Sequence, residues 1–129
     1  MRPIPENPTV AILGGAGEMG RTAVAIVSQF EQIGELIIGD FNEEKAKYVV
    51  SQNVESAQTS LRAQFVDVTD REQLYSFLSD VTIVLNTVGP FYKFGVDVLT
   101  AAIESGCHYV DICDDWEPTI EMMDLDQDA

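Results

Sequence analysis

The chain has 129 residues, of which 46% are hydrophobic and 22% are charged, proportions that fit one globular domain and argue against disorder. Asp and Glu number 22 against 7 Lys and Arg; the resulting net charge of −15 argues against nucleic acid or an anionic membrane surface as a partner. No apolar run approaches the roughly 18 residues of a membrane span, and the first residues lack the apolar stretch of a signal peptide. We therefore expect a soluble, cytoplasmic protein. Cys107 and Cys113 have no zinc or redox spacing, and the sequence predicts no metal site.

Short β-branched and aliphatic runs alternate along the chain with segments of helical periodicity. A capping box of Thr69 and Glu72 opens the third predicted helix, and Pro118 starts the last one. Continuous apolar strands separated by helices predict an α/β fold, a doubly wound parallel sheet in three α/β/α layers. The predicted strands are 9–13, 35–39, 61–66, 81–85 and 108–112, and the predicted helices are 18–30, 42–51, 69–78, 95–105 and a segment from 118 onward.

Apolar spacing also predicts which helix faces turn inward. In the first helix the inward residues are Met19, Ala23, Ile26, Val27 and Phe30, and in the last helix they are Ile120, Met123 and Leu125.

A glycine-rich loop follows the first strand and opens the first helix. The G-x-G-x-x-G pattern fits Gly15, Gly17 and Gly20, which predicts a dinucleotide-binding fold of the Rossmann type. Gly15 would allow the tight turn, Gly17 the approach of a pyrophosphate, and Gly20 close packing of helix and strand. Backbone N–H groups at the helix N-terminus can bind phosphates even in an acidic protein. The expected cofactor-binding residues of this loop are Gly14, Gly15, Ala16, Gly17, Glu18, Met19 and Gly20.

Three further strand ends are expected to complete the cofactor site. Asp40 ends the second strand 20 residues after Gly20, where a carboxylate accepts ribose hydroxyls and repels a 2′-phosphate. This favours NAD over NADP, although a strand-end or capping role for Asp40 stays open. The expected residues at these ends are Asp40, Phe41 and Asn42, then Asp67 and Val68, then Thr87, Val88, Gly89 and Pro90. A plain turn stays open as the alternative both for Asp67 and for the segment 86–90.

The chain resembles the N-terminal NAD(P)-binding domain of the saccharopine dehydrogenase-like oxidoreductases. The resemblance rests on GGAGEMG (14–20), NTVGPFYKFG (86–95) and AAIESGCHYVDICDD (101–115). It implies an NAD(P)-dependent oxidoreductase that transfers hydride at a C–N bond of an amino-acid-like substrate. The resemblance also implies a second domain that contacts the substrate, and it leaves a homodimer open. This chain departs from many relatives at 113–116 and, through Asp40, in its expected cofactor.

The last helix ends in Asp124, Asp126 and Asp128, where the helix dipole favours cations, and no sixth strand follows. We therefore expect residues 1–129 to be a dinucleotide-binding domain taken from a longer protein that carries a C-terminal substrate or dimerisation domain, and to be inactive alone. The sequence identifies no catalytic residue. His108 lies in the fifth strand and has the position of a structural imidazole.

Two other classes stay open. Gly14, Gly17 and Gly20 also fit the spacing of short-chain dehydrogenases and epimerases, but no Tyr in the chain is followed by Lys four residues later. A stand-alone NAD-sensing regulatory domain would also match this length.

Overall fold

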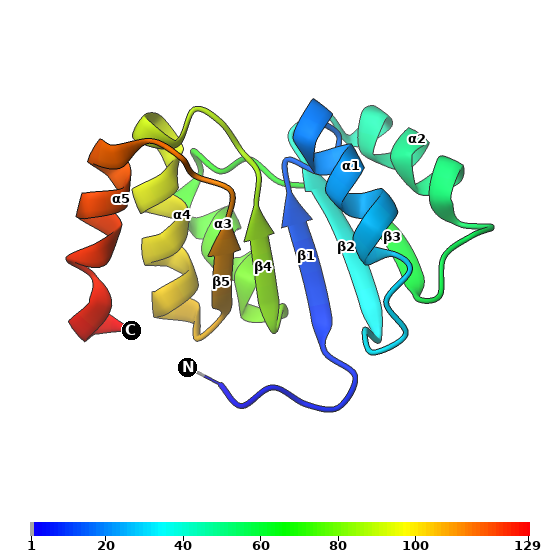
Figure 1. Ribbon diagram of the computed structural model, residues 1–129, viewed down its shortest axis with the longest axis horizontal. Helices are drawn as coiled ribbons and strands as arrows, with labels where there is room; N and C mark the ends of the chain where they lie inside the picture. The colour runs from blue at the N-terminus through cyan, green and yellow to red at the C-terminus, as the bar shows by residue number, and fades with distance from the viewer. Residues whose placement is uncertain (1) are drawn as a thin grey trace.

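The computed structural model describes residues 2–129 as alternating strands and helices (Figure 1). The alternation and the parallel strands of the expected fold are confirmed. The strands are β1 (Thr9–Leu13), β2 (Glu35–Asp40), β3 (Ser60–Phe65), β4 (Ile83–Asn86) and β5 (His108–Asp111); the helices are α1 (Glu18–Val27), α2 (Glu43–Asn53), α3 (Arg71–Ser79), α4 (Phe91–Ser105) and α5 (Trp116–Met123), with a 3-10 turn at Asp126–Asp128.

The five strands form one parallel sheet in the order β3-β2-β1-β4-β5. The chain moves outward from β1 in one direction and then, after β3, crosses back to β4 on the other side. This reversal makes the sheet doubly wound and leaves a crevice at the carboxyl end of β1, between β2 and β4.

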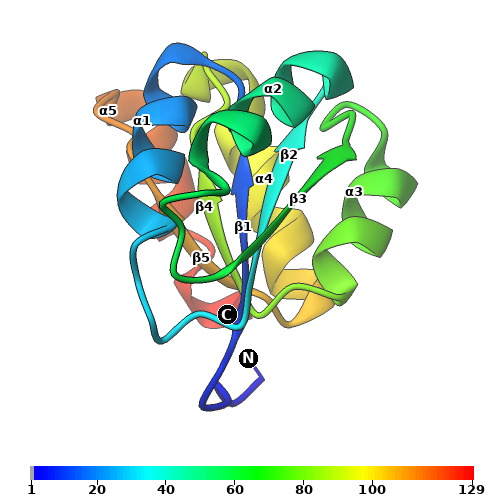
Figure 2. The same cartoon turned by 90° about the vertical axis from the view of Figure 1, so that its right-hand side faces the viewer.

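Alternate residues of β1 supply the two halves of the core. Val10 and Ile12 pack with α1 and α2 on one face, and Ala11 and Leu13 pack with α3 and α4 on the other. Figure 2 shows the sheet edge-on between these helices. This two-sided burial explains why the strands read as continuous apolar runs.

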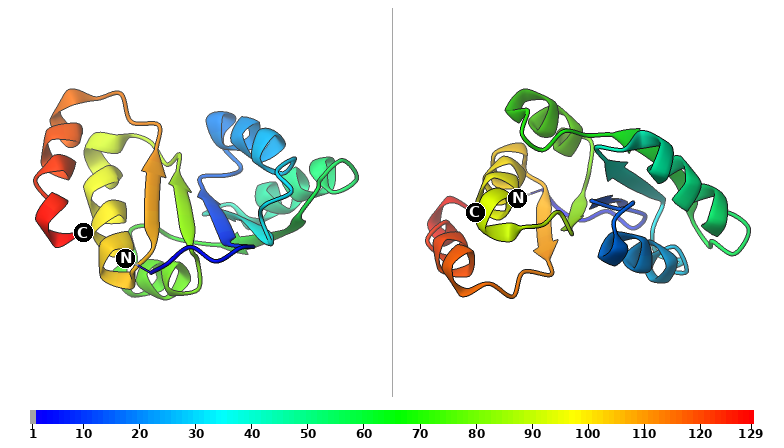
Figure 3. Two further views of the ribbon diagram at one scale, coloured as in Figure 1. Left: turned by 60° about the horizontal axis from the view of Figure 1, so that its bottom comes forward. Right: turned by 90° about the horizontal axis from the view of Figure 1, so that it is seen from above.

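One helical layer is incomplete. On the face that carries α1 and α2, no helix within residues 2–129 covers β4 and β5 (Figures 1 and 3). Helix α5, which follows β5, packs against α4 and so does not cover this face. The side chain of Val110 on β5 therefore stays 54% exposed.

Several predicted boundaries and faces are wrong. Helix α1 ends at Val27, and its sheet side carries Gly20 and Val24. Of the predicted inward residues, Ala23 and Val27 do pack against the core, while Met19 and Ile26 are exposed. Gly20 must touch the preceding loop, and this close contact sets the rotation of the helix about its axis. Phe30 also lies beyond the helix and is exposed.

Two other helix starts differ from the prediction. The N-cap of α3 is Asp70, whose side chain accepts the N–H of Gln73, so the Thr69 capping box does not form. Helix α4 begins at Phe91, four residues before the predicted start at Gly95. The predicted strand 81–85 is observed as Ile83–Asn86.

The last helix begins at Trp116 rather than at Pro118, and its predicted inward face is wrong for Ile120 and Met123, which are exposed. Met122, not Met123, contacts α4: a Cβ added to Gly95 of α4 would lie 2.4 Å from Cε of Met122.

Candidate functional site

The glycine loop joins β1 to α1 through a turn that requires Gly14. This residue has φ +77°, a left-handed conformation, and its N–H donates to the carbonyl of Gly39 at 2.8 Å. The expectation that Gly15 permits the turn is therefore wrong. Gly15 is constrained for another reason, since a Cβ there would lie 2.6 Å from Cγ2 of Ile38.

The other two glycines of the motif differ in what surrounds them. A Cβ on Gly20 would lie 1.9 Å from the carbonyl oxygen of Gly14, so only glycine lets α1 approach the loop this closely. A Cβ on Gly17 would meet only that same oxygen, at 3.2 Å, and otherwise open space. The protein's own packing thus demands Gly20 more strongly than Gly17.

The N-terminus of α1 offers unpaired donors. Its N-cap is Gly17, which has no side chain, and the first helical hydrogen bond runs from the N–H of Arg21 to the carbonyl of Gly17. Among residues 2–129, no acceptor binds the N–H groups of Glu18, Met19 and Gly20. Unpaired N–H groups at the positive end of a helix dipole suit a phosphate group.

The carboxylate of Asp40 lies at the end of β2, beside this loop. Its Oδ2 accepts the N–H of Ala16 at 3.0 Å, and its Oδ1 accepts the N–H of Asn42 at 2.8 Å. Asn42 in turn caps α2 by accepting the N–H of Lys45. Each carboxylate oxygen retains a second lone pair, so the oriented group can accept further hydrogen bonds.

At the end of β3, Asp67 forms a compact turn with Thr69. The hydroxyl and the N–H of Thr69 donate to one carboxylate oxygen at 2.6 and 2.9 Å, and they hold the pKa of Asp67 below its ordinary value. A carboxylate is therefore present here at neutral pH.

At the end of β4, the backbone is fixed by two residues. Thr87 donates both its N–H and its hydroxyl to the carbonyl of Leu13, at 2.9 and 2.6 Å. Asn86 accepts the N–H of Val88 through its side chain at 3.0 Å. A Cβ added to Gly89 would meet nothing within 4 Å, so Gly89 borders open space.

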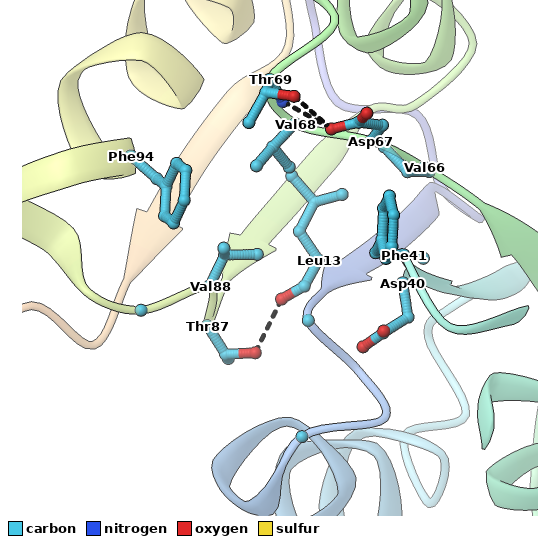
Figure 4. Close-up of a pocket in the computed structure, with 14 residues that line it drawn as sticks. Leu13, Asp40, Phe41, Val66, Asp67, Val68, Thr69, Thr87, Val88 and Phe94 are labelled. Atoms are coloured by element: carbon cyan, nitrogen blue, oxygen red, sulfur yellow. Dashed lines mark hydrogen bonds between the residues drawn. The ribbon is translucent and has the colours of Figure 1, made fainter.

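These strand ends surround one cleft of about 550 Å³ at the crevice beside β1 (Figure 4). In that view Asp40 and Phe41 lie on one side of Leu13, and Thr87 and Val88 lie on the other. Of the expected cofactor-binding residues, the cleft is lined by Gly14, Gly17, Asp40, Phe41, Asp67, Val68, Thr87, Val88 and Gly89.

The remaining expected residues lie outside the cleft lining: Gly15, Ala16, Glu18, Met19, Gly20, Asn42 and Pro90. The lining also includes residues that were not among the expected cofactor-binding residues: Leu13, Gly39, Val66, Thr69 and Phe94. Four of these adjoin expected positions in the sequence. Phe94 does not adjoin an expected position. It reaches the cleft from the first turn of α4, which lies before the helix start predicted at Gly95.

A nicotinamide dinucleotide fits this set of groups. The cleft lies at the switch point of the sheet, N–H groups without an acceptor among residues 2–129 lie at the start of α1, and the carboxylate of Asp40 lies at the end of β2. No side chain here is identified as a proton donor. His108 lies at the start of β5, the opposite sheet edge, where its Nε2 contacts the carbonyl of Arg2.

No helix within residues 2–129 is both long and apolar enough to cross a membrane.

Comparisons with known proteins agree with this geometry. The chain matches the family described as saccharopine dehydrogenase NADP binding domain over residues 10–127. A lipid droplet localized protein of Caenorhabditis elegans is 28% identical over 109 residues, which are 80% of this chain and 25% of that protein. The chain thus spans about a quarter of the length of this curated relative.

Solved structures share the fold at low identity. Apo saccharopine dehydrogenase (L-Glu forming) of Saccharomyces cerevisiae superposes with a TM-score of 0.69 and 18% identity, over 95% of this chain and 24% of that one. Shikimate 5-dehydrogenase of Listeria monocytogenes, solved with shikimate and NAD, has a TM-score of 0.53 and 21% identity, over 95% and 49%. The match over residues 10–127 covers most of the chain, which therefore belongs to the family of saccharopine dehydrogenase NADP-binding domains and is a nicotinamide dinucleotide-binding domain.

Proposed function

We propose that the cleft binds NAD(H) in preference to NADP(H), and that the chain is the nucleotide-binding part of a longer oxidoreductase. The observation that carries the preference is the carboxylate of Asp40, which the N–H groups of Ala16 and Asn42 hold at the end of β2. A carboxylate at this position accepts ribose hydroxyls and repels a 2′-phosphate.

Each group in the cleft or beside it has one proposed task. The N–H groups at the start of α1 bind the pyrophosphate, Asp40 binds the adenosine ribose, and Asp67 and Val68 border the adenine. Thr87, Val88 and Gly89 line the opposite side of β1 and receive the nicotinamide half. When bound, the dinucleotide supplies a hydride acceptor or donor.

Titration calorimetry with NADH and NADPH tests this proposal. We expect NADH to bind at least about tenfold more tightly, because burying a 2′-phosphate beside a fixed carboxylate costs more than 1 kcal/mol. Tighter binding of NADPH would contradict the role of Asp40. Binding of neither would contradict the assignment of the cleft.

For the whole protein we propose hydride transfer at a C–N bond of an amino-acid-like substrate, supported by the family and by the similarity to the yeast enzyme. The substrate contacts would come from a further domain. The test is to follow NADH absorbance with the longer protein, an oxo-acid and an amine, and with this chain alone as control. Turnover by the longer protein but not by this chain would support the proposal that a further domain supplies the substrate contacts. Absence of turnover in both would contradict the proposed reaction.

A further inference from the structure

A buried amide lies directly behind the cleft. Asn86 ends β4 with no exposed surface, and its side-chain oxygen and nitrogen each take part in one hydrogen bond. Its Oδ1 accepts the N–H of Val88 at 3.0 Å, and its Nδ2 donates to the hydroxyl of Tyr109 at 3.2 Å. The amide thus connects the cleft loop to the neighbouring strand.

The connection continues to a carboxylate on β5. The hydroxyl of Tyr109 donates to Oδ2 of Asp111 at 2.7 Å, and Oδ1 of the same carboxylate accepts the N–H of Cys113 at 3.0 Å. Tyr109 and Asp111 are two residues apart and so share one face of the strand, while Asp111 pairs with Asn86 in the sheet register.

Each hydrogen bond in this series has a fixed direction, set at one end by the carboxylate of Asp111 and at the other by the N–H of Val88, which can only donate. An ionised carboxylate only accepts, so the Tyr109 hydroxyl donates to it and offers a lone pair to Nδ2 of Asn86. The oxygen of the Asn86 amide then faces Val88. Without the hydroxyl, the buried Nδ2 loses its acceptor, and without the carboxylate the hydroxyl proton is free to turn toward Nδ2 and oppose that bond; either change loosens the amide that holds the N–H of Val88.

We propose that Asp111 and Tyr109 are positioning residues for the nicotinamide half of the cleft, and that they act through Asn86, whose orientation holds residues 87–89 in place. Neither residue lines the cleft. This inference rests on the proposed binding of a dinucleotide, because the role of the loop depends on which half of the ligand it meets.

The first test compares two ligands with the variant Tyr109→Phe. ADP-ribose carries the adenosine, pyrophosphate and second ribose but no nicotinamide. We expect the variant to bind NADH about fivefold to tenfold more weakly and ADP-ribose within about twofold of the native chain. The control is Tyr75→Phe, which removes a hydroxyl from the exposed face of α3 and should change neither affinity.

A general loss of structure would weaken both ligands by the same factor, and that outcome would overturn the positioning role. Failure of the native chain to bind ADP-ribose would instead contradict the proposed function itself. The two failures are therefore distinguishable.

The second test reverses the direction of the hydrogen bonds. In Asn86→Asp, two carboxylates compete for the single hydroxyl proton of Tyr109, and we expect NADH to bind at least about tenfold more weakly. Adding Asp111→Asn lets the new amide donate to the tyrosine oxygen and still accept the N–H of Cys113. The double variant should regain most of the lost NADH affinity. A double variant no better than the single one would overturn the proposal.

Discussion

Oδ2 of Asp40 accepts the N–H of Ala16 at 3.0 Å, a hydrogen bond that joins the end of β2 to the glycine loop across 24 residues of sequence. The carboxylate therefore has a structural task whether or not a ligand is bound. The alternatives of ribose binding and local structure are not exclusive at this residue, because a carboxylate can accept about four hydrogen bonds.

Replacing Asp40 by Ala should consequently affect both binding and folding. We expect NADH affinity to fall by about 1–2 kcal/mol, since a charge-assisted bond to ribose is lost, and NADPH affinity to fall less or to rise. Loss of the bonds to Ala16 and Asn42 should lower the free energy of unfolding by about 1–2 kcal/mol. Calorimetry and urea denaturation measure the two effects.

The matched control is Asp80→Ala, which removes an equal charge from the exposed end of α3. It should leave both nucleotide affinities unchanged. An Asp40→Ala variant that lost NADH and NADPH affinity equally would show that the carboxylate does not discriminate between the two cofactors.

The glycines of the loop should separate stability from binding. Gly20→Ala places a methyl group 1.9 Å from the carbonyl oxygen of Gly14, and we expect a loss of about 3 kcal/mol of stability or a failure to fold. Gly17→Ala meets that oxygen at 3.2 Å and should cost about 1 kcal/mol or less.

NADH affinity should depend on Gly17, although the stability of the fold depends little on it. The Gly17 methyl group would project where the loop faces a pyrophosphate, so the folded Gly17→Ala chain should bind NADH about tenfold or more weakly. Gly89→Ala, whose methyl group meets no protein atom, is the stability control. Urea denaturation and calorimetry give the two measurements, and unchanged NADH affinity in Gly17→Ala would argue against a close approach of the phosphates.

The sequence predicts the strands and the loop because their signals are local. The run Thr9–Leu13 consists of β-branched and apolar residues and is observed with those bounds. Which face of a helix turns inward is harder to predict from local signals. The spacing of Met19 and Ile26 indicates an inward stripe, yet the contact of Gly20 with Gly14 turns these two side chains outward.

Long-range polar contacts leave no periodic signal at all. Asn86 and Tyr109 are 23 residues apart, and their side chains meet only because β4 and β5 are neighbours in the sheet. Arg2 and Ser79 are a further example, 77 residues apart. A single sequence shows the residue types of such pairs but not their distance.

Arg2 should contribute strongly to stability although it lies outside every helix and strand. Its guanidinium donates to the carbonyls of Ser79 at 2.8 Å, of Gly106 at 3.2 Å, and of two further residues, Leu78 and Val81. These carbonyls lie at and just beyond the C-terminal ends of α3 and α4, where the helix dipoles favour a cation.

We expect Arg2→Ala to lower the free energy of unfolding in urea by about 2–3 kcal/mol, and Arg2→Lys to recover only part of it, because an ammonium cannot reach all four carbonyls. Arg21→Ala removes an equal charge from an exposed position and controls for the change in net charge. Equal losses in the Arg2 and Arg21 variants would mean that net charge, not the hydrogen bonds, explains the effect.

The buried thiol of Cys107 should make stability fall at alkaline pH. Burial raises its pKa from 9.0 to about 11, so the unfolded chain loses this proton first. The contribution of the protonated thiol to stability is complete below pH 9 and is lost as pH rises toward 11, by about 2 kcal/mol.

Urea denaturation at pH 8 to 11 should show a steeper loss of stability for the native chain than for Cys107→Ala. Tyr109, whose pKa burial also raises, is common to both chains and cancels in the comparison. Parallel curves for the native chain and Cys107→Ala would show that the thiol does not contribute.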